Sequence, residues 1–331
     1  MAYSVSMNAA STDSPLVVIV GPTASGKSTL GVALAKKFDG EIVACDSTQL
    51  YRGFDIGTAK PTRAERAEVP HHLLDVLQAD EPSTAGDYRE RAERVLADIK
   101  SRAKLPILTV GTGLYLRALL EGLAELPQRS EELRERLREG AGTHGPGHLH
   151  DVLKKLDAEA AAKIAPGDEQ KIIRAIEVCL LANKPLSEVH RTGRKPLLGW
   201  RAVKIGLQPL REELVNRIHA RTEAMLAAGW LEEVRGLLAQ NCAEDSKPFD
   251  FIGYRELREV LRGKLTVAGA REAIQQSTRH YAKRQQTWFR RELGVHWLTG
   301  FGDDPIIQQA AGRHLAGLGI AQGRGGLRSG V

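Results

Sequence analysis

A glycine-containing segment near the N-terminus has the residue types and spacing of a loop that binds phosphate groups. Its residues are Gly21, Pro22, Thr23, Ala24, Ser25, Gly26, Lys27 and Ser28. The glycines let backbone N–H groups converge on phosphate oxygens, and a following helix adds the positive end of its dipole. Lys27 can neutralise phosphate charge, and the hydroxyl of Ser28 can hold Mg²⁺. Since an apolar run at 16–20 precedes the loop and a helical stretch at 29–38 follows it, the segment predicts binding of a polyphosphate or pyrophosphate.

An aspartate follows the next apolar run along the chain. The run at 42–45 predicts a strand, and Asp46 comes directly after it. Open α/β sheets bind ligands beyond the carboxyl ends of their strands, so we expect this carboxylate to face the phosphate loop. Such a group can act as a general base or hold Mg²⁺ through water, and the alternative is a helix N-cap with Gln49 at the capping-box position. Cys45 is expected to point into the core, because strand residues alternate between two faces.

A second strand-to-helix turn repeats this arrangement. A strand at 107–110 is followed by Gly111, Thr112 and Gly113, and then by a helical stretch that reaches Leu120. We expect Thr112 to project into the same cleft as Asp46; a plain turn without a ligand is the alternative. His71 and His72 are neighbours and so cannot bind one metal from a single helix face, which indicates a structural or surface role.

Cationic side chains share one face of a long C-terminal helical stretch. At about 100° per residue, Arg279, Lys283 and Arg290 lie together, whereas Tyr281 and Trp288 lie opposite. From Ser277 to Arg291 there is no acidic residue, which is unusual for a solvated face. Phosphates of a nucleic acid, or the pyrophosphate of a ligand, would satisfy these charges; a merely solvated face is the alternative.

A second pair of cations, Arg217 and Arg221, lies one helical turn apart on another helical stretch. This pair can bind phosphate, or it can form ordinary salt bridges at the surface.

These residues must be positioned by strands and helices, whose pattern along the chain predicts an α/β fold. The expected fold has a P-loop NTPase-like parallel sheet and a helical insertion domain. The expected strands are at 16–20, 42–45, 107–110 and 203–207, and long amphipathic helices are expected at 211–226, 231–238 and 267–291. Between these parts the chain changes to charged helical stretches, such as 130–138 and 170–182. The predicted division is a disordered tail at 1–14, the first part of the core at 15–126, a helical insertion at 127–198, the second part of the core at 199–300 and a mostly flexible tail at 301–331.

Composition narrows the class of protein. A chain of 331 residues exceeds the usual size of a single core, and 47 Lys and Arg against 41 Asp and Glu give a net charge of +6, which permits a nucleic-acid partner. Cys45, Cys179 and Cys242 lack the spacing of a disulfide framework or a zinc site, which predicts a reducing cytoplasm. No apolar run approaches the roughly 20 residues that span a bilayer, and the N-terminus has no signal peptide pattern.

Six motifs in order resemble tRNA dimethylallyltransferases of the bacterial type, over about residues 15–298. They are the phosphate loop, Asp46-Ser47 with Tyr51, Asp55-Ile56-Gly57-Thr58-Ala59-Lys60-Pro61, Gly111-Thr112-Gly113-Leu114-Tyr115, Phe251-Ile252-Gly253-Tyr254, and the segment from Tyr281 to Arg290. The family transfers a dimethylallyl group from dimethylallyl diphosphate to N6 of adenosine 37 of tRNA, 3′ of the anticodon. One departure is that Val110 stands where the family usually has a first glycine.

The resemblance implies a role for each matching residue. The loop with Lys27 and Ser28 would hold the diphosphate with Mg²⁺ and without ATP, and Arg217 or Arg221 would bind the same group. Asp46 would accept the proton from the N6 amine, while Thr112 would help to hold an adenine flipped out of its stack. Stretches that would touch the anticodon stem-loop are Asp46, Ser47, Thr48 and Gln49 with Thr112; Gln170, Lys171, Ile172, Ile173 and Arg174; and Asp250, Phe251, Ile252, Gly253, Tyr254 and Arg255. The cations Arg279, Lys283 and Arg290 are expected to bind the same RNA on the ground of helix geometry, independently of the resemblance.

Three alternatives have testable signatures. A small-molecule kinase with the same loop would turn over ATP, a cytokinin-type isopentenyltransferase would accept AMP in place of tRNA, and a non-catalytic RNA-binding module would release no diphosphate. We expect a cytoplasmic monomer with no membrane contact and no obligate protein partner.

Overall fold

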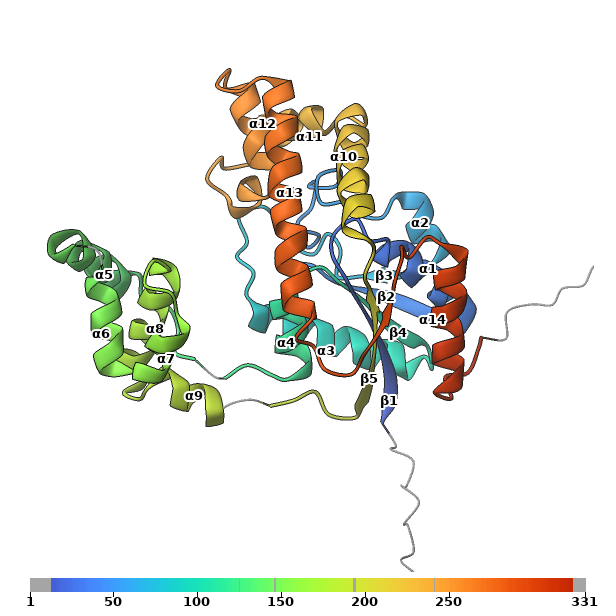
Figure 1. Ribbon diagram of the computed structural model, residues 1–331, viewed down its shortest axis with the longest axis horizontal. Coiled ribbons are helices and arrows are strands. Elements are labelled where there is room, and N and C mark those ends of the chain that lie inside the picture. The colour runs from blue at the N-terminus through green and yellow to red at the C-terminus, as the bar shows by residue number, and fades with distance from the viewer. Residues whose placement is uncertain (1–12, 125, 146, 193–194, 241, 324–331) are drawn as a thin grey trace, which may run out of the picture. The chain divides into compact units, whose positions relative to one another are not determined.

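The computed structural model describes residues 13–124, 126–145, 147–192, 195–240 and 242–323. The chain divides into two compact units (Figure 1). Met1–Leu119 together with Leu198–Val331 form the first unit, and Leu120–Leu197 form the second. Residues 1–12 of the predicted N-terminal tail lie outside the described residues, whereas Ser14 is already the first residue of a strand.

The first unit contains a six-stranded sheet in the order β3-β2-β4-β1-β5-β6. All of its strand pairs are parallel, with Val17 of the central strand opposite both Ile107 and Val203. The strands are β1 (Ser14–Val20), β2 (Gly40–Cys45), β3 (His71–His72), β4 (Leu105–Val110), β5 (Trp200–Leu207) and β6 (Val295–Leu298). The predicted α/β fold with a parallel sheet is therefore confirmed. Strands β3 and β6 were not predicted, because two and four residues are too short to show a pattern.

Helices cover the sheet and extend beyond the carboxyl ends of its strands. They are α1 (Lys27–Phe38), α2 (Arg63–Glu68), α3 (Ala85–Ser101), α4 (Gly113–Leu120), α10 (Arg211–Ala227), α11 (Trp230–Ala239), the 3₁₀ helix η1 (Lys247–Asp250), α12 (Tyr254–Leu261), α13 (Val267–Phe289) and α14 (Pro305–Gly317). Figure 1 shows α10, α11, α12 and α13 gathered past the end of the sheet to which β1 runs. The loops that leave β1, β2 and β4 therefore face these four helices.

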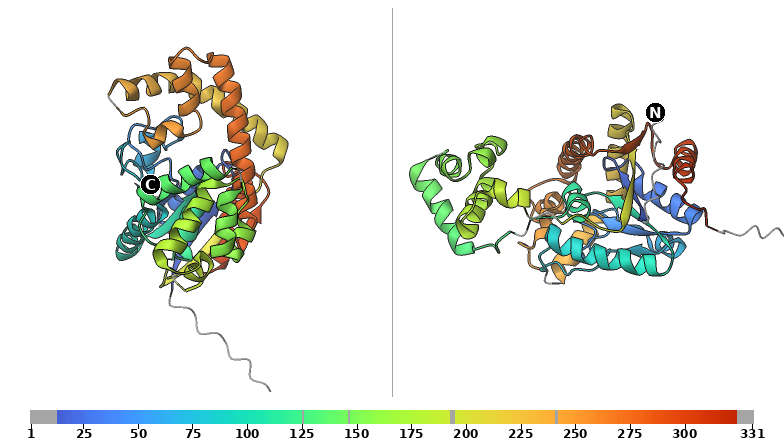
Figure 2. Two further views of the ribbon diagram at one scale, coloured as in Figure 1. Left: turned by 90° about the vertical axis from the view of Figure 1, so that its left-hand side faces the viewer. Right: turned by 90° about the horizontal axis from the view of Figure 1, so that it is seen from below.

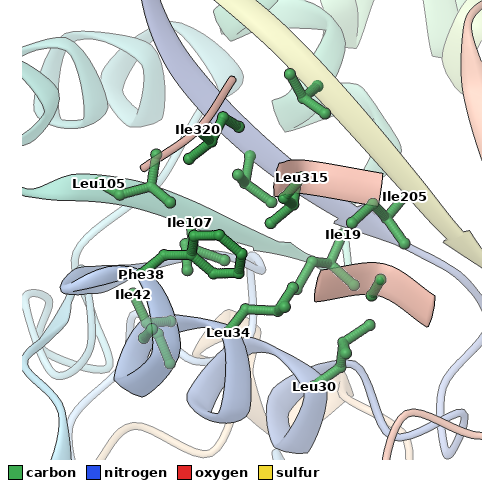
Figure 3. Close-up of a cluster of buried hydrophobic side chains, with 14 of the residues drawn as sticks. Ile19, Leu30, Leu34, Phe38, Ile42, Leu105, Ile107, Ile205, Leu315 and Ile320 are labelled. Carbon is green, nitrogen blue, oxygen red and sulfur yellow. The ribbon is translucent and has the colours of Figure 1, made fainter. Parts of the chain in front are cut away.

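The core of the first unit corrects one prediction. Leu34 and Phe38 of α1 pack with Ile19 and Ile107 of the sheet and with Leu315 of α14 (Figure 3). The interpretation of 301–331 as a mostly flexible tail is thus wrong for the described part, 301–323. The missed signal was a helix start at Asp304-Pro305, whose carboxylate accepts from the N–H of Ile306, followed by buried Ile307, Ala311 and Leu315 at helical spacing.

The second unit is built from helices in its described part (Figure 2). They are α5 (Glu131–His144), α6 (His148–Leu156), α7 (Ala158–Lys163), α8 (Glu169–Ala182) and α9 (Leu186–Thr192). Leu149, Leu153, Ile172 and Ile176 lie in a separate hydrophobic core. The insertion was predicted at 127–198; of its predicted helices, 170–182 lies within α8, and 130–138 lies within α5 except for Ser130, which is the N-cap of α5. Its binding of RNA stays a prediction.

Candidate active site

The phosphate loop connects the end of β1 to the start of α1. Gly21 and Gly26 have φ angles of 149° and 83°, which disfavour any residue with a Cβ atom. A Cβ atom at Gly26 would also lie 2.8 Å from the backbone nitrogen of Gly302. The Lys27 Nζ donates to the carbonyl oxygen of Pro22 at 2.7 Å, so the ammonium lies across the loop. The local geometry is that of a cradle for anionic oxygens.

Asp46 lies directly against the turn that follows β4. Its Oδ1 accepts hydrogen bonds from the Thr48 N–H at 2.9 Å and the Thr48 hydroxyl at 2.8 Å. A Cβ atom at Gly111 would lie 1.8 Å from Asp46 Oδ2, so only glycine fits there. No helix begins at Asp46, which makes the N-cap alternative wrong. Val110 is the buried last residue of β4. The close contact with the Asp46 carboxylate is therefore made by Gly111 and not by residue 110.

Thr112 ties the turn after β4 to the turn after β2. Its hydroxyl oxygen accepts from the Ser47 N–H at 2.9 Å and lies 3.1 Å from the Ser47 hydroxyl. Its own N–H donates to the carbonyl oxygen of Cys45. Burial raises the pKa of the Cys45 thiol to about 12, so this side chain is a core group, as predicted. His72 is a structural residue, since its Nε2 lies 2.6 Å from Glu41 Oε2.

Two cavities meet at Asp46. A polar cavity of about 350 Å³ is lined by the phosphate loop, and a second cavity of about 330 Å³ is lined by side chains of α10, α11 and α13. We call them the phosphate cavity and the apolar cavity. The phosphate cavity includes Lys27, Ser28, Gly111, Arg217, Arg221 and Asp303, and the apolar cavity includes Ile218, Met225, Trp230, Ile252, Ile274 and Tyr281. Asp46, Thr23, Ala24, Thr58 and Arg221 line both.

Two desolvated cations stand on the phosphate side of this junction. Burial lowers the pKa of Lys27 to about 7; the Asp46 charge opposes this shift, and the Arg221 charge adds to it. Burial also lowers the pKa of Arg221, again opposed by Asp46. Arg221 Nη1 lies 3.5 Å from the Thr23 hydroxyl in the phosphate loop. Two poorly solvated positive charges favour a multiply charged anion between them.

Arg217 differs from Arg221 in that its guanidinium already has a partner. Its two terminal nitrogens donate to the two carboxylate oxygens of Asp303 at 2.6 Å each, and it stacks on the Phe301 ring at 4.0 Å. The Gly302 N–H donates to the carbonyl oxygen of Ser25, so this segment packs on the phosphate loop. Asp303 was missed because its segment was predicted to be flexible.

Helix α13 contributes both buried and exposed groups. The amide of Gln285 bonds both Thr23 and Gly111, and the Tyr281 hydroxyl also donates to Gly111. On the predicted cationic face, Lys283 and Arg290 are exposed. Arg279 is half-buried and lies 2.7 Å from His219 Nε2, so it is less available than the prediction assumed.

Comparisons with known proteins agree on one family. Family models described as IPP transferase and Isopentenyl transferase match residues 49–292 and 14–81. The tRNA dimethylallyltransferase of Koribacter versatilis is 56% identical over 295 residues, covering 89% of this chain and 96% of that protein. This chain belongs to the tRNA dimethylallyltransferase family. It is a prenyl transferase, and the resemblance seen in the sequence is confirmed.

Other members of the tRNA dimethylallyltransferase family are similar along most of their length. The one from Geobacter sulfurreducens is 46% identical, with 88% of this chain and 94% of that protein covered. A solved tRNA delta(2)-isopentenylpyrophosphate transferase from Staphylococcus epidermidis has a TM-score of 0.65 at 37% identity, covering 92% of this chain and 98% of that one. A eukaryotic dimethylallyltransferase acting on tRNA has a TM-score of 0.76 at 26% identity, covering 91% and 78%. Among the described residues, no helix could span a membrane.

The stretches expected to touch tRNA in this chain contain some side chains that are buried. In the second unit, Ile172 and Ile173 are 2% and 4% exposed within its core, and Arg174 pairs with Glu177 at 2.5 Å. In the first unit, Tyr254 is fully buried. The predicted RNA contacts therefore do not extend to the side chains of Ile172, Ile173 and Tyr254. Gln170, Lys171 and Arg255 are exposed, whereas Asp250, Phe251 and Ile252 line the apolar cavity.

Tyr254 instead helps to hold the loop 55–60, which the sequence motif marked without explaining. The Tyr254 hydroxyl donates to Glu233 Oε1 at 2.5 Å and accepts from the Gly57 N–H at 3.2 Å. Glu233 Oε2 accepts the N–H groups of Asp55 at 3.1 Å and Ile56 at 2.8 Å. Buried Lys60 pairs with Asp55 and Asp75 at 2.8 and 2.5 Å. The loop that carries Gly57 and Thr58 into the apolar cavity is thus fixed from both ends.

Proposed function

We propose that this chain transfers a dimethylallyl group from dimethylallyl diphosphate to N6 of adenosine 37, 3′ of the anticodon, in certain tRNAs. The products would be N6-isopentenyladenosine and diphosphate. The observation that carries the proposal is the position of Asp46, which lines both the phosphate cavity and the apolar cavity. A carboxylate at that junction can act on an acceptor nitrogen while the diphosphate stays on the other side.

The phosphate cavity would bind the diphosphate through backbone N–H groups of the loop and through the cations Lys27 and Arg221. Ser28 is exposed in the first turn of α1 and lines the same cavity. A hydroxyl that shares a cavity with phosphate oxygens suits Mg²⁺, which prefers oxygen ligands and retains water. Bound there, Mg²⁺ would neutralise charge on the leaving diphosphate.

The apolar cavity would receive the adenine after it has left the base stack. Asp46 accepts a proton from the N6 amine as the bond between N6 and the allylic carbon forms. The bond from that carbon to the diphosphate oxygen breaks, and its electron pair leaves with the diphosphate. Thr112 would help to hold the base next to Asp46, because its hydroxyl fixes the turn at Ser47. The surrounding Ile218, Met225 and Ile274 suit the apolar dimethylallyl group.

We further propose that the chain acts as a monomer in the cytoplasm. In support of the compartment, Cys45 and Cys179 are free and buried, as in a reducing environment.

One assay tests the reaction directly. Purified protein is incubated with dimethylallyl diphosphate, Mg²⁺ and tRNA that lacks the modification, and the digested tRNA is examined by mass spectrometry for N6-isopentenyladenosine. Parallel reactions replace tRNA by AMP, or dimethylallyl diphosphate by ATP. Product with tRNA alone is the expected result. Product formed from AMP, or turnover of ATP, would contradict the proposal in favour of a cytokinin-type enzyme or a kinase.

A further inference from the structure

A single glutamine of α13 connects the two glycine turns of the active site. Gln285 is 6% exposed, and both ends of its amide are bonded. Its Oε1 accepts the N–H of Thr23 at 2.7 Å, and its Nε2 donates to the carbonyl oxygen of Gly111 at 2.8 Å. These two partners lie 262 and 174 residues away in the sequence. Among the hydrogen bonds described above, those of Gln285 are the ones that join the phosphate loop to the turn after β4.

Both partners of Gln285 are at places where a small shift would matter. Thr23 belongs to the phosphate loop and lines both cavities. Gly111 is the residue against which Asp46 lies so closely that a Cβ atom there would be 1.8 Å from the carboxylate. A shift of Gly111 would therefore change the position that the Asp46 side chain can occupy. A shift of Thr23 would move the loop that holds the diphosphate.

We propose that Gln285 is a positioning residue that sets the distance between the bound diphosphate and the carboxylate of Asp46. It acts through Thr23 and Gly111 and touches neither substrate. The inference rests on the proposed function, because it assigns the diphosphate to one cavity and the acceptor amine to the junction. Displacement of reacting groups by about 1 Å is enough to slow a reaction by about a hundredfold, since reacting atoms must be closely aligned.

The amide is the chemical group that this position requires. It offers an acceptor at one end and a donor at the other, matching an N–H group and a carbonyl oxygen. Tyr281 donates a second hydrogen bond to the same Gly111 oxygen at 3.0 Å, so that oxygen keeps one partner when the other is lost. The Thr23 N–H has only Gln285 among the bonds described for it.

The first test replaces the amide by an apolar side chain of similar size. For Gln285→Met we expect kcat for tRNA prenylation to fall by about tenfold or more, because two buried bonds to the site are lost, with KM for tRNA within about twofold. Gln276→Met is the matched control, since Gln276 is an exposed glutamine of the same helix. A kcat for Gln285→Met within twofold of the control would overturn the proposal.

The second test uses a pH profile, which a role in stability alone would not change. In Gln285→Glu, the ionised carboxylate accepts from Thr23 but faces the Gly111 oxygen without a proton to donate. The neutral carboxyl restores both bonds, and burial favours the neutral form. The ratio of the kcat of this variant to that of the wild type should therefore rise as the pH falls. A ratio that is independent of pH would overturn the proposal, even if Gln285→Met fails to fold.

A third measurement separates this inference from the proposed reaction. Hydrogen exchange of the Thr23 amide needs no substrate, and we expect it to be at least tenfold faster in Gln285→Met than in Gln276→Met. If the wild type forms no prenylated tRNA while this exchange difference is found, the proposed function fails and the link through Gln285 stands. Equal exchange in the two variants would overturn the link, whatever the activity.

Discussion

The phosphate cavity and the apolar cavity share Asp46 but are built in different ways. The first is built on one continuous segment, the phosphate loop with the helix that begins at Lys27, to which residues such as Arg217, Arg221 and Asp303 are added from elsewhere in the chain. The second is made by side chains from α10, α11 and α13, together with a loop that Glu233 and Tyr254 hold in place. The anion site thus starts from a local backbone loop that sequence-distant cations complete, whereas the acceptor pocket depends on long-range packing throughout.

The largest effect is expected where the two cavities meet. In Asp46→Asn the side-chain oxygen can still accept from Thr48, so the turn should keep its shape. The amide cannot take the proton of the N6 amine, and loss of a general base typically costs about 10²- to 10⁴-fold in rate. We expect kcat to fall by about that factor while tRNA affinity in a filter-binding assay is unchanged. Near-normal turnover would remove Asp46 from the role of base.

Next in size is a change confined to the phosphate cavity. Lys27→Ala should weaken binding of dimethylallyl diphosphate by about tenfold to a hundredfold, because a desolvated cation is lost from an anion site. tRNA affinity should be nearly unchanged, and equal loss of both would contradict the separation of the two cavities.

The pH dependence of that binding has a defined sign. Since the pKa of Lys27 is lowered to about 7 by burial, the ammonium is present below this pH and is lost as the pH rises through it. Diphosphate binding should therefore weaken above pH 7 in the wild type, with uptake of a proton measurable by calorimetry in buffers of different ionisation enthalpy. The Lys27→Ala variant is the control, because its pH profile shows the effect of titration of the ligand alone. If the wild type and this variant had parallel pH profiles, the pH dependence would not come from Lys27.

Local patterns in the sequence were sufficient to predict the phosphate loop and most strands of the sheet. Strand β1, Lys27 and Asp46 are set by neighbours in the chain, so periodicity and glycine spacing predicted them. Gln285 and Asp303 were missed because their partners are far away in sequence, and a lone glutamine or aspartate has no local pattern. The segment at 301–323 was misjudged for a different reason, since the local helix signal at Asp304-Pro305 with Ile307, Ala311 and Leu315 was present and was overlooked.

A smaller effect should distinguish the two arginines of α10. Arg221 is desolvated beside Thr23, whereas Arg217 is already neutralised by Asp303. Arg221→Ala should raise KM for dimethylallyl diphosphate by about tenfold, and Arg217→Ala by about threefold at most, because exposed pairs contribute little. Steady-state kinetics of the two variants provides the measurement. The opposite order would show that Arg217 leaves Asp303 to bind the diphosphate.

On the acceptor side, the hydroxyl of Tyr254 can be removed while its ring is kept. Burial and the charge of Glu233 raise the pKa of Tyr254, so the hydroxyl stays protonated and donates to Glu233. Tyr254→Phe should lower the free energy of unfolding by about 1 to 3 kcal/mol, measured in urea, because the half-buried carboxylate of Glu233 loses a partner. We also expect a KM for tRNA a few-fold higher, with binding of dimethylallyl diphosphate unchanged.

Tyr115→Phe is the control for this variant, because its hydroxyl bonds Ser83 and Tyr115 lines neither cavity. If Tyr254→Phe weakened diphosphate binding as much as tRNA binding, the two cavities would not be independent.

The smallest effect is expected on the exposed face of α13. Lys283 and Arg290 are exposed and have no role in either cavity, so their charges can act only on a partner outside the site. If they contact RNA phosphates, Lys283→Ala and Arg290→Ala should each weaken tRNA binding a few-fold and reduce the slope of log affinity against log salt by about one unit or less. Binding should weaken equally for all tRNAs, since phosphate contacts do not read sequence. Affinities measured at several salt concentrations, with Gln276→Met as a neutral control on the same helix, give this slope. A slope that is unchanged in both variants would remove this face from the RNA interface, and a higher KM for dimethylallyl diphosphate instead would place these cations on the phosphate side of the comparison.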